Sequence, residues 1–144
     1  MKLADVAAAL LNILNQISKL AGRCYGQEQA SVVDAPSLQL RLMGIEERIY
    51  IGGGKRRAIY SFTARLFVQF SDNAAAEADL MSLVAAIYDQ LDTHKRTGWG
   101  AGSTVTDVEP TGTASTGYAT SNGVVYRSID IPIRVESEEE VSYA

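Results

Sequence analysis

The sequence predicts an α+β fold: an antiparallel or mixed sheet with two main helices packed on one face, a basic-tipped β-hairpin and a long Gly/Thr/Ser-rich loop. Apolar residues recur at helical spacing near residues 3–20 and 73–91, and at alternate positions between and after these segments. Hairpin-length connections between the early strands favour an antiparallel sheet over a parallel βαβ array. With 144 residues, 47% hydrophobic and 21% charged, the chain suits a single domain spanning residues 1–144.

The opening segment is expected to form one amphipathic helix over residues 3–20. Its apolar residues alternate in spacing between three and four and share one stripe: Leu3, Val6, Leu10, Ile13, Ile17 and Leu20. Gly22 lies where a C-terminal cap is expected. We interpret the stripe as facing the core, with a partner-facing helix as the alternative. Because Asp5, Asn12 and Gln16 interrupt the apolar run, we expect neither a signal peptide nor a membrane span.

Alternating apolar residues predict three strands in the next part of the chain. The first begins at Ser37 and places residues 38, 40 and 42 on one face, and a short second strand covers residues 48–51. A third strand over residues 60–70 has the clearest alternation in the sequence. The glycine turn at residues 52–54 is expected to join the last two strands into an antiparallel hairpin. Its tip carries three consecutive cations: Lys55, Arg56 and Arg57.

A second helix is expected over residues 73–91. Asp72 and Asn73 are suitable N-cap residues, and His94 lies near the negative end of the helix dipole, where it is expected to act as a C-terminal cap. The apolar face of this helix, containing Leu80, Ile87 and Leu91 among others, is expected to form the core against the sheet.

Residues 97–123 contain no Lys or Arg and few large apolar residues. Residues 103–108 suit a strand, and the remainder is expected to be a long mobile loop that orders on a partner. Trp99 and Tyr118 are therefore candidate partner contacts, together with the basic tip. A closing strand is expected over residues 129–135, at the edge of the sheet because Pro132 cannot donate to a ladder. Residues 136–144 are expected to form an acidic flexible tail.

The usual motifs for nucleotide binding fail in this sequence. A phosphate-binding loop would need glycine at Ile49 and Ser or Thr at Arg56, and a dinucleotide fingerprint would need glycine at Ser103. The net charge of −4 argues against a general nucleic-acid binder, because such proteins depend on cations that neutralise phosphates.

The single cysteine and single histidine limit catalysis and metal binding. Cys24 and His94 together cannot make any of the usual His/Cys metal sites or, without further partners, a nucleophilic triad. We therefore expect no catalytic residue and no cofactor, while an all-carboxylate magnesium site stays open. Two interpretations of the basic tip stay open as well: a solvated turn, and a contact with phosphate or an acidic partner.

The order of elements resembles that of the tail terminator and tail completion proteins of tailed bacteriophages. The features that carry the resemblance are the opening helix, the hairpin at residues 52–57 leading into the strand at 60–70, the helix at 73–91 and the closing strand at 129–135. The resemblance implies a structural virion protein, assembled in the bacterial cytoplasm and not associated with a membrane. It implies a ring, commonly a homo-hexamer, that stops growth of the tail tube and joins it to the head connector, with transient DNA contact in the lumen.

Two other classes of function stay open at this point. One is another neck adaptor that contacts nucleic acid through its basic tip, and the other is a small enzyme with an unrecognised carboxylate site. The sequence pattern shows no continuous hydrophobic seam, so the isolated chain is expected to be a monomer or a weakly held ring.

Overall fold

Six strands and two helices make up the parts of the chain that the computed structural model describes, which are residues 2–26, 35–70, 72–99 and 103–140. In chain order the elements are α1 (Lys2–Asn15), the short 3-10 helix η1 (Ser18–Leu20), β1 (Cys24–Tyr25), β2 (Ser37–Gly52), β3 (Lys55–Gln69), α2 (Asn73–Thr93), β4 (Val105–Pro110), β5 (Ser115–Ser121) and β6 (Val124–Glu140). The sheet order is β1-β2-β3-β6-β4, with β5 also paired to β6. Only the β1–β2 pair is parallel, so the predicted α+β class is confirmed.

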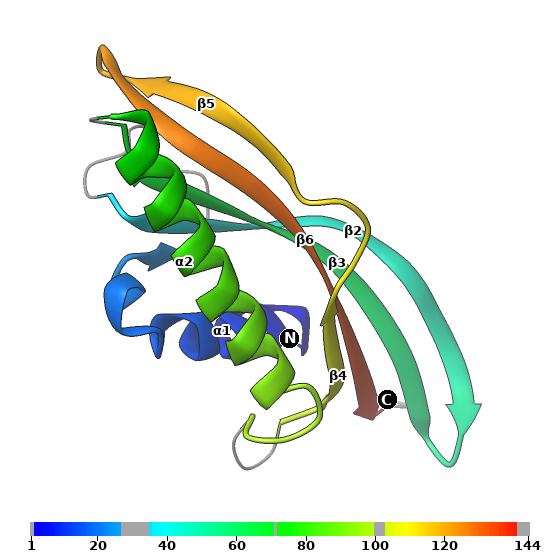
Figure 1. The fold of residues 1–144 in the computed structure, drawn as a ribbon. Helices are drawn as coiled ribbons and strands as arrows, with labels where there is room; N and C mark the ends of the chain where they lie inside the picture. Colours follow the sequence, from blue (N-terminus) through cyan, green and yellow to red (C-terminus); the bar gives the residue numbers. More distant parts are fainter. Residues whose placement is uncertain (1, 27–34, 71, 100–102, 141–144) are drawn as a thin grey trace.

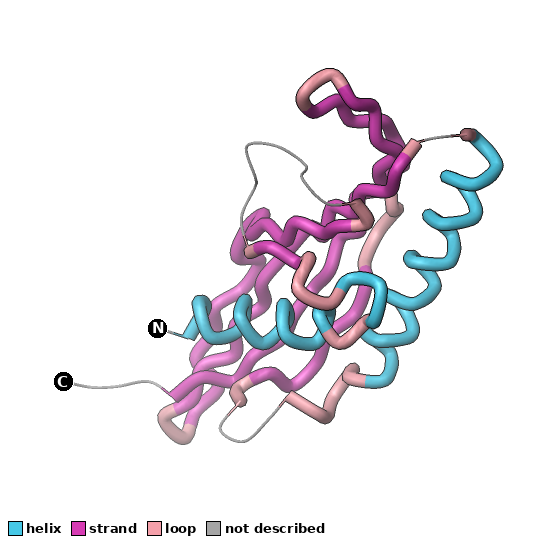
Figure 2. The backbone as a smooth tube through the Cα atoms, turned by 90° about the vertical axis from the view of Figure 1, so that its left-hand side faces the viewer, coloured by secondary structure: helices cyan, strands magenta, loops and turns pink. Residues whose placement is uncertain are grey.

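Both helices lie on the same face of the sheet (Figure 1; Figure 2). The predicted alternation in β3 is confirmed, because its inward residues from Tyr60 to Val68 are at most 3% exposed. The β6 residues paired with them are inward as well: Ile129, Ile131, Ile133 and Val135. Helix α1 contributes Val6, Leu10 and Leu14 to this core, and α2 contributes Leu80, Leu83, Ile87 and Leu91. One hydrophobic core therefore lies between the sheet and the two helices.

Helix α2 has the predicted caps at both ends. The carboxylate of Asp72 accepts hydrogen bonds from the backbone N–H groups of Ala74 and Ala75, at 2.9 and 3.2 Å. At the other end, the backbone N–H of His94 donates to the carbonyl of Gln90, and the His94 ring nitrogen Nδ1 lies 3.0 Å from the same oxygen. These contacts satisfy groups that a helix terminus otherwise leaves unpaired.

The first helix is shorter than predicted, since it ends at Asn15 and the chain continues as the separate turn η1. The side chain of Asn15 accepts from the backbone N–H groups of Gly22 and Cys24, at 3.1 and 3.2 Å. Gly22 has the positive φ expected of a residue that reverses the chain after a helix. The apolar spacing continues through η1, and Leu20 is still buried, so spacing alone could not mark the break.

The two strands predicted before the glycine turn are one continuous strand, β2. Its register with β3 shifts between Leu42 and Gly44, between Ile45 and Glu47, and between Tyr50 and Gly52. Each shift is a β-bulge that adds one residue and interrupts the alternation of side chains. The alternation of apolar residues is therefore interrupted at positions where the strand itself continues. The predicted antiparallel hairpin between β2 and β3 is confirmed.

The prediction of a long mobile loop over residues 97–123 is wrong for its second half. Besides β4, the segment contains β5, which pairs with β6 through a tight turn at Asn122 and Gly123. Both turn residues have positive φ, as a two-residue hairpin turn requires. Backbone hydrogen bonding to β6 orders this Thr/Ser/Gly-rich segment even though it buries few apolar side chains. Residues 100–102 lie outside the described parts of the chain.

Strand β6 lies inside the sheet and not at its edge, contrary to the prediction from Pro132. It has β3 on one side and β4 and β5 on the other. The Pro132 carbonyl accepts from the backbone N–H of Thr111, at 2.9 Å. Because the N and C=O of a strand residue point to the same side, the missing N–H faces the gap between β4, which ends opposite Ile133, and β5, which begins opposite Asp130. No ladder hydrogen bond is lost at that gap.

The acidic segment predicted as a solvated tail is the end of β6. Residues 136–140 pair with β3, and Glu139 is only 6% exposed. The hydroxyl of Tyr60 donates to its carboxylate at 2.6 Å. Only residues 141–144 of the predicted tail lie outside the described parts of the chain.

Candidate functional site

The most unusual surface feature is the second half of β2, residues 41–52, which we call the β2 arm. Six large apolar side chains of the arm are between 45% and 59% exposed: Leu42, Met43, Ile45, Ile49, Tyr50 and Ile51. Single exposed apolar residues are common, but six along one strand segment make it a candidate surface for contact with another molecule. The register places Ile45 and Tyr50 on the face that carries the helices and Ile49 on the opposite face. The sequence-based expectation of no continuous apolar seam does not account for this group.

The arm is exposed because the rest of the fold ends before it. Strand β1 covers the outer edge of β2 only at Leu38 and Gln39. Beyond that point, no strand in the described parts of the chain pairs with this edge. Figure 1 shows the β2–β3 turn projecting past the helices at the lower right, at the same end of the sheet as the C-terminal end of β6. The arm therefore presents both open backbone and apolar side chains.

The predicted basic tip adjoins the arm, and the register places acids beside it. Lys55, Arg56 and Arg57 lie directly opposite the three glutamates that end β6, at positions 140, 139 and 138. Opposite charges across a strand pair attract each other. Arg57 also pairs with Glu47 of β2, with Nη2 3.1 Å from Oε1. The acidic neighbours offset the tip's positive charge, so it is not an isolated cationic patch.

A buried polar contact joins β3 to β6 beneath the tip. The Tyr60 hydroxyl and the Glu139 carboxylate are 2.6 Å apart, and both residues are almost fully buried. Burial is the main factor that raises the pKa of Tyr60 to about 12, and the hydrogen bond to Glu139 and its negative charge add to the rise. Tyr60 therefore stays protonated at neutral pH and acts as a hydrogen-bond donor that stabilises the base of the arm.

Two of the predicted contact residues lie away from the tip. Trp99 follows α2, packs partly against the core, and donates from Nε1 to the carbonyl of His94 at 2.7 Å. Tyr118 lies on β5 and is 61% exposed. Its ring makes a T-shaped contact with Phe70, and the guanidinium of Arg127 lies 4.7 Å from its centroid. The five predicted contact residues thus occupy three different places in the fold.

Two further exposed apolar residues lie on the same β5–β6 hairpin as Tyr118. Val124 and Val125, which follow the hairpin turn, are 51% and 41% exposed. In both views the hairpin lies at the opposite end of the sheet from the β2–β3 turn (Figure 1; Figure 2). Sequence analysis selected Tyr118 but not these valines, because it predicted that the closing strand begins at residue 129, whereas β6 begins at Val124.

The surroundings of Cys24 and His94 favour structural roles. Burial raises the pKa of the Cys24 thiol to about 12, so the reactive thiolate is scarce at neutral pH. The Cys24 sulfur lies 3.7 Å from the carbonyl oxygen of Leu20, and His94 caps α2. The described residues contain no group of three or more His, Cys, Asp or Glu side chains that could hold a metal ion.

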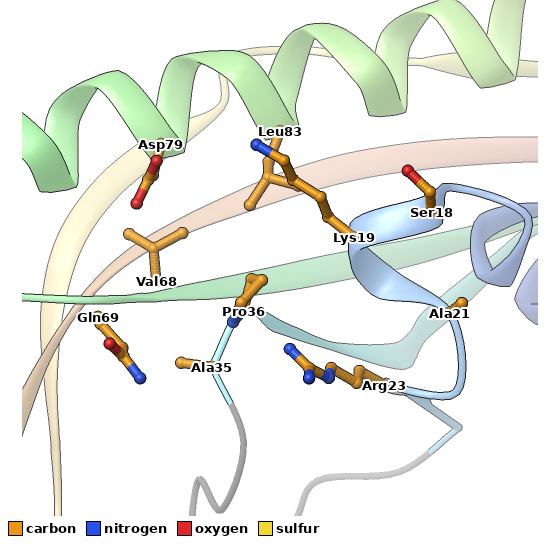
Figure 3. A pocket seen from close by; sticks show the side chains of 10 residues that line it. All are labelled: Ser18, Lys19, Ala21, Arg23, Ala35, Pro36, Val68, Gln69, Asp79 and Leu83. Atoms are coloured by element: carbon orange, nitrogen blue, oxygen red, sulfur yellow. The ribbon is translucent and has the colours of Figure 1, made fainter.

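A depression of about 400 Å³ lies between η1, the end of β3 and α2 (Figure 3). Its lining combines the charged residues Lys19, Arg23 and Asp79 with apolar residues such as Val68 and Leu83. Its described lining contains no nucleophile paired with a base. This depression therefore suggests no particular reaction.

Comparison with known proteins adds no family. No protein-family model matches the chain, and no curated protein matches it. In the described parts of the chain, no helix is long and apolar enough to span a membrane. The β2 arm and the β5–β6 hairpin are therefore the features from which a function must be inferred.

Proposed function

We propose that this protein is a phage tail terminator, a structural subunit that forms a ring, with six copies as the expected number, on the end of the tail tube. The observation that carries this proposal is the β2 arm, which pairs with β3 on one side, has no strand on its outer edge in the described parts of the chain, and exposes six large apolar side chains. Such a surface suits contact between protein subunits. The order of elements, which resembles that of tail terminators and tail completion proteins, supports the same conclusion. The proposed partners are further copies of the chain, the tail tube protein and the head connector.

The size of the apolar arm suits subunits that assemble only in an array. Fully burying one large apolar side chain stabilises by about 1.5–3 kcal/mol. Each of the six residues is about half exposed, so covering the arm contributes on the order of 5–9 kcal/mol. Association costs roughly 4–15 kcal/mol in lost freedom of motion. One contact between two subunits is therefore weak. Subunits associate stably in a closed ring or on a preformed tube end, where several contacts form together.

Contact with nucleic acid through the basic tip is the weaker candidate. The three glutamates of β6 lie opposite the three cations of the tip, and Arg57 is already paired with Glu47. Phosphate binding there would compete with these carboxylates. Transient contact with DNA inside a ring needs no dedicated cationic site.

The proposal is tested by following tube growth in the presence of the purified protein. Tail tube protein is polymerised with wild-type chain or with the variant Ile45→Ser/Ile49→Ser/Tyr50→Ser, and tube lengths and ends are examined by electron microscopy. We expect the wild-type protein to give capped tubes of limited length. The triple variant should stay folded but melt at a lower temperature, because the buried half of each replaced side chain contributes to stability, and it should leave tubes uncapped.

Met81→Ser is the matched control, because Met81 is a 65% exposed apolar residue on α2, outside the arm. It should cap tubes as well as the wild-type chain. Tubes that grow without limit and carry no terminal density in the presence of folded wild-type protein would contradict the proposed function.

A further inference from the structure

Besides the outer edges of the terminal strands β1 and β4, two edge segments lack a strand partner in the described parts of the chain, the outer edges of the β2 arm and of β5, and these two lie at diagonally opposite corners. At one end, the outer edge of β2 is covered by β1 at residues 38–39, while β5 on the far side is open. At the other end, the segment after α2 contacts the outer edge of β4, where the backbone N–H of Val108 donates to the Lys95 carbonyl. The outer edge of the β2 arm at this end has no strand partner in the described parts of the chain. Each end therefore has one covered edge and one open edge.

The open edges have the polarity needed to join one copy to the next. Strands β2, β3, β6 and β5 alternate in direction across the sheet, because each neighbouring pair is antiparallel. Suppose that a second copy extends the sheet with its strands in the same order and the same directions. Its β5 then lies beside the β2 of the first copy, and the two strands are antiparallel. Antiparallel pairs are the commoner and slightly more stable type.

The side chains of β5 suit this pairing, while the β2 stretch combines the charged residues Glu47 and Arg48 with the apolar Ile49 and Tyr50. Strand β5 contains no charged residue and no proline, the devices by which edge strands usually avoid pairing with other chains. Thr116, Tyr118 and Thr120 are exposed along it. In the β2 arm, the four residues from Glu47 to Tyr50 keep a regular register between two bulges. This regular stretch gives β5 a straight segment of backbone with which to pair.

From these observations we propose that the β2 arm of one copy pairs with β5 of the next copy, head to tail, so that the sheets of neighbouring subunits join. This inference rests on the proposed function and deepens it by naming the contact between subunits. The two contacting surfaces differ, so the contact is heterologous and generates a ring when the rotation closes. Pairing of β2 with β2, or β5 with β5, would leave one of the two exposed apolar groups uncovered in every dimer.

Chemical cross-linking distinguishes these arrangements. In a Cys24→Ala background, Arg48→Cys is placed on the arm and Thr116→Cys on β5, singly and together. The register puts both positions on the helix-bearing face of the sheet. Each protein is treated with a short bismaleimide at increasing concentration. We expect a ladder of oligomers, ending at the ring, only for the protein that carries both cysteines. Dimers from either single-cysteine protein, or no cross-linked product from the double-cysteine protein at the highest concentration, would overturn the proposal.

Mixing of blocked variants gives a second test that does not depend on cross-linking geometry. The arm variant Ile45→Ser/Ile49→Ser/Tyr50→Ser keeps an open β5, and Thr116→Lys/Thr120→Lys keeps an open arm. Each should be monomeric alone, and their mixture should give a 1:1 heterodimer and nothing larger in analytical ultracentrifugation. Two folded variants that stay monomeric when mixed at concentrations where wild-type chain assembles would refute head-to-tail pairing.

The outcomes separate this inference from the proposed function. Capped tubes of limited length without the predicted cross-link would leave the terminator function standing and refute the β2–β5 contact. A cross-linked ladder from a protein that leaves tubes uncapped would support the contact and refute the terminator function.

Discussion

Replacing Tyr60 with Phe tests whether the buried contact between Tyr60 and Glu139 stabilises the base of the β2 arm. The change removes a 2.6 Å hydrogen bond to a carboxylate that is 6% exposed. A hydrogen bond to a charged group contributes about 1.5–3 kcal/mol, and the carboxylate loses its donor. Arg56 lies opposite Glu139 and offsets part of this cost. We expect the free energy of unfolding to fall by about 2 kcal/mol, a drop in melting temperature of about 5–8 °C.

A double-mutant cycle separates the hydrogen bond from other effects of the substitution. Tyr60→Phe, Glu139→Met and the double variant are unfolded with urea under identical conditions, and the coupling energy is taken from the four free energies. We expect a coupling of about 1–2 kcal/mol, because the double variant leaves no unpaired polar group in the site. A single Tyr60→Phe variant within 0.5 kcal/mol of wild type would refute the reasoning.

The same pair predicts a loss of stability at alkaline pH. The folded-state pKa of Tyr60, raised to about 12, lies above the ordinary value of 10.0. Its contribution to stability is therefore complete below pH 10 and is lost as the pH rises towards 12. Two pKa units correspond to at most about 3 kcal/mol. The measurement is the difference between wild type and Tyr60→Phe from pH 8 to pH 12, which isolates this tyrosine from the others.

Three further substitutions test the caps and turns. Asp72→Ala removes the acceptor of two backbone N–H groups and should lower the free energy of unfolding by about 1 kcal/mol in urea titration, with Asp89→Ala on the exposed face of α2 as control. Gly123→Val places a β-branched residue at φ 77° and should destabilise by about 1–2 kcal/mol; an unchanged melting temperature would argue against the β5–β6 turn. Replacing Lys55, Arg56 and Arg57 with Ser should cost only tenths of a kcal/mol per pair, less at high salt.

Much of the fold could be predicted from local patterns. The alternation in β3 survives because its inward residues are buried along the whole strand, and the N-cap Asp72 acts only on its own helix. The glycine run has positive φ at each of its three residues, which few other residues adopt, so the turn between β2 and β3 was evident. In each case the physical cause lies within a few residues of the signal.

The candidate site was predicted only in part. Sequence analysis selected the basic tip and Tyr118 but not the apolar residues of the β2 arm, because alternation predicts which residues share a face and not whether anything covers that face. It also placed Pro132 at a sheet edge. A proline fits inside a sheet when its nitrogen faces a gap between partner strands, and this gap exists because β4 ends opposite Ile133 and β5 begins opposite Asp130.

The sequence by itself determined the α+β class, the two helices and the β2–β3 hairpin, because periodicity, caps and turn residues act over short distances along the chain. Only the tertiary structure decided whether the acidic C-terminal segment is a solvated tail or part of a strand. Five residues rich in glutamate resemble a solvated tail, yet they form the end of β6, where Lys55 and Arg56 lie opposite Glu140 and Glu139 and the Tyr60 hydroxyl donates to Glu139. These partners lie about 80 residues away, as the pair Tyr60 and Glu139 shows with its separation of 79. Pairing over such a distance depends on register, which no local pattern contains.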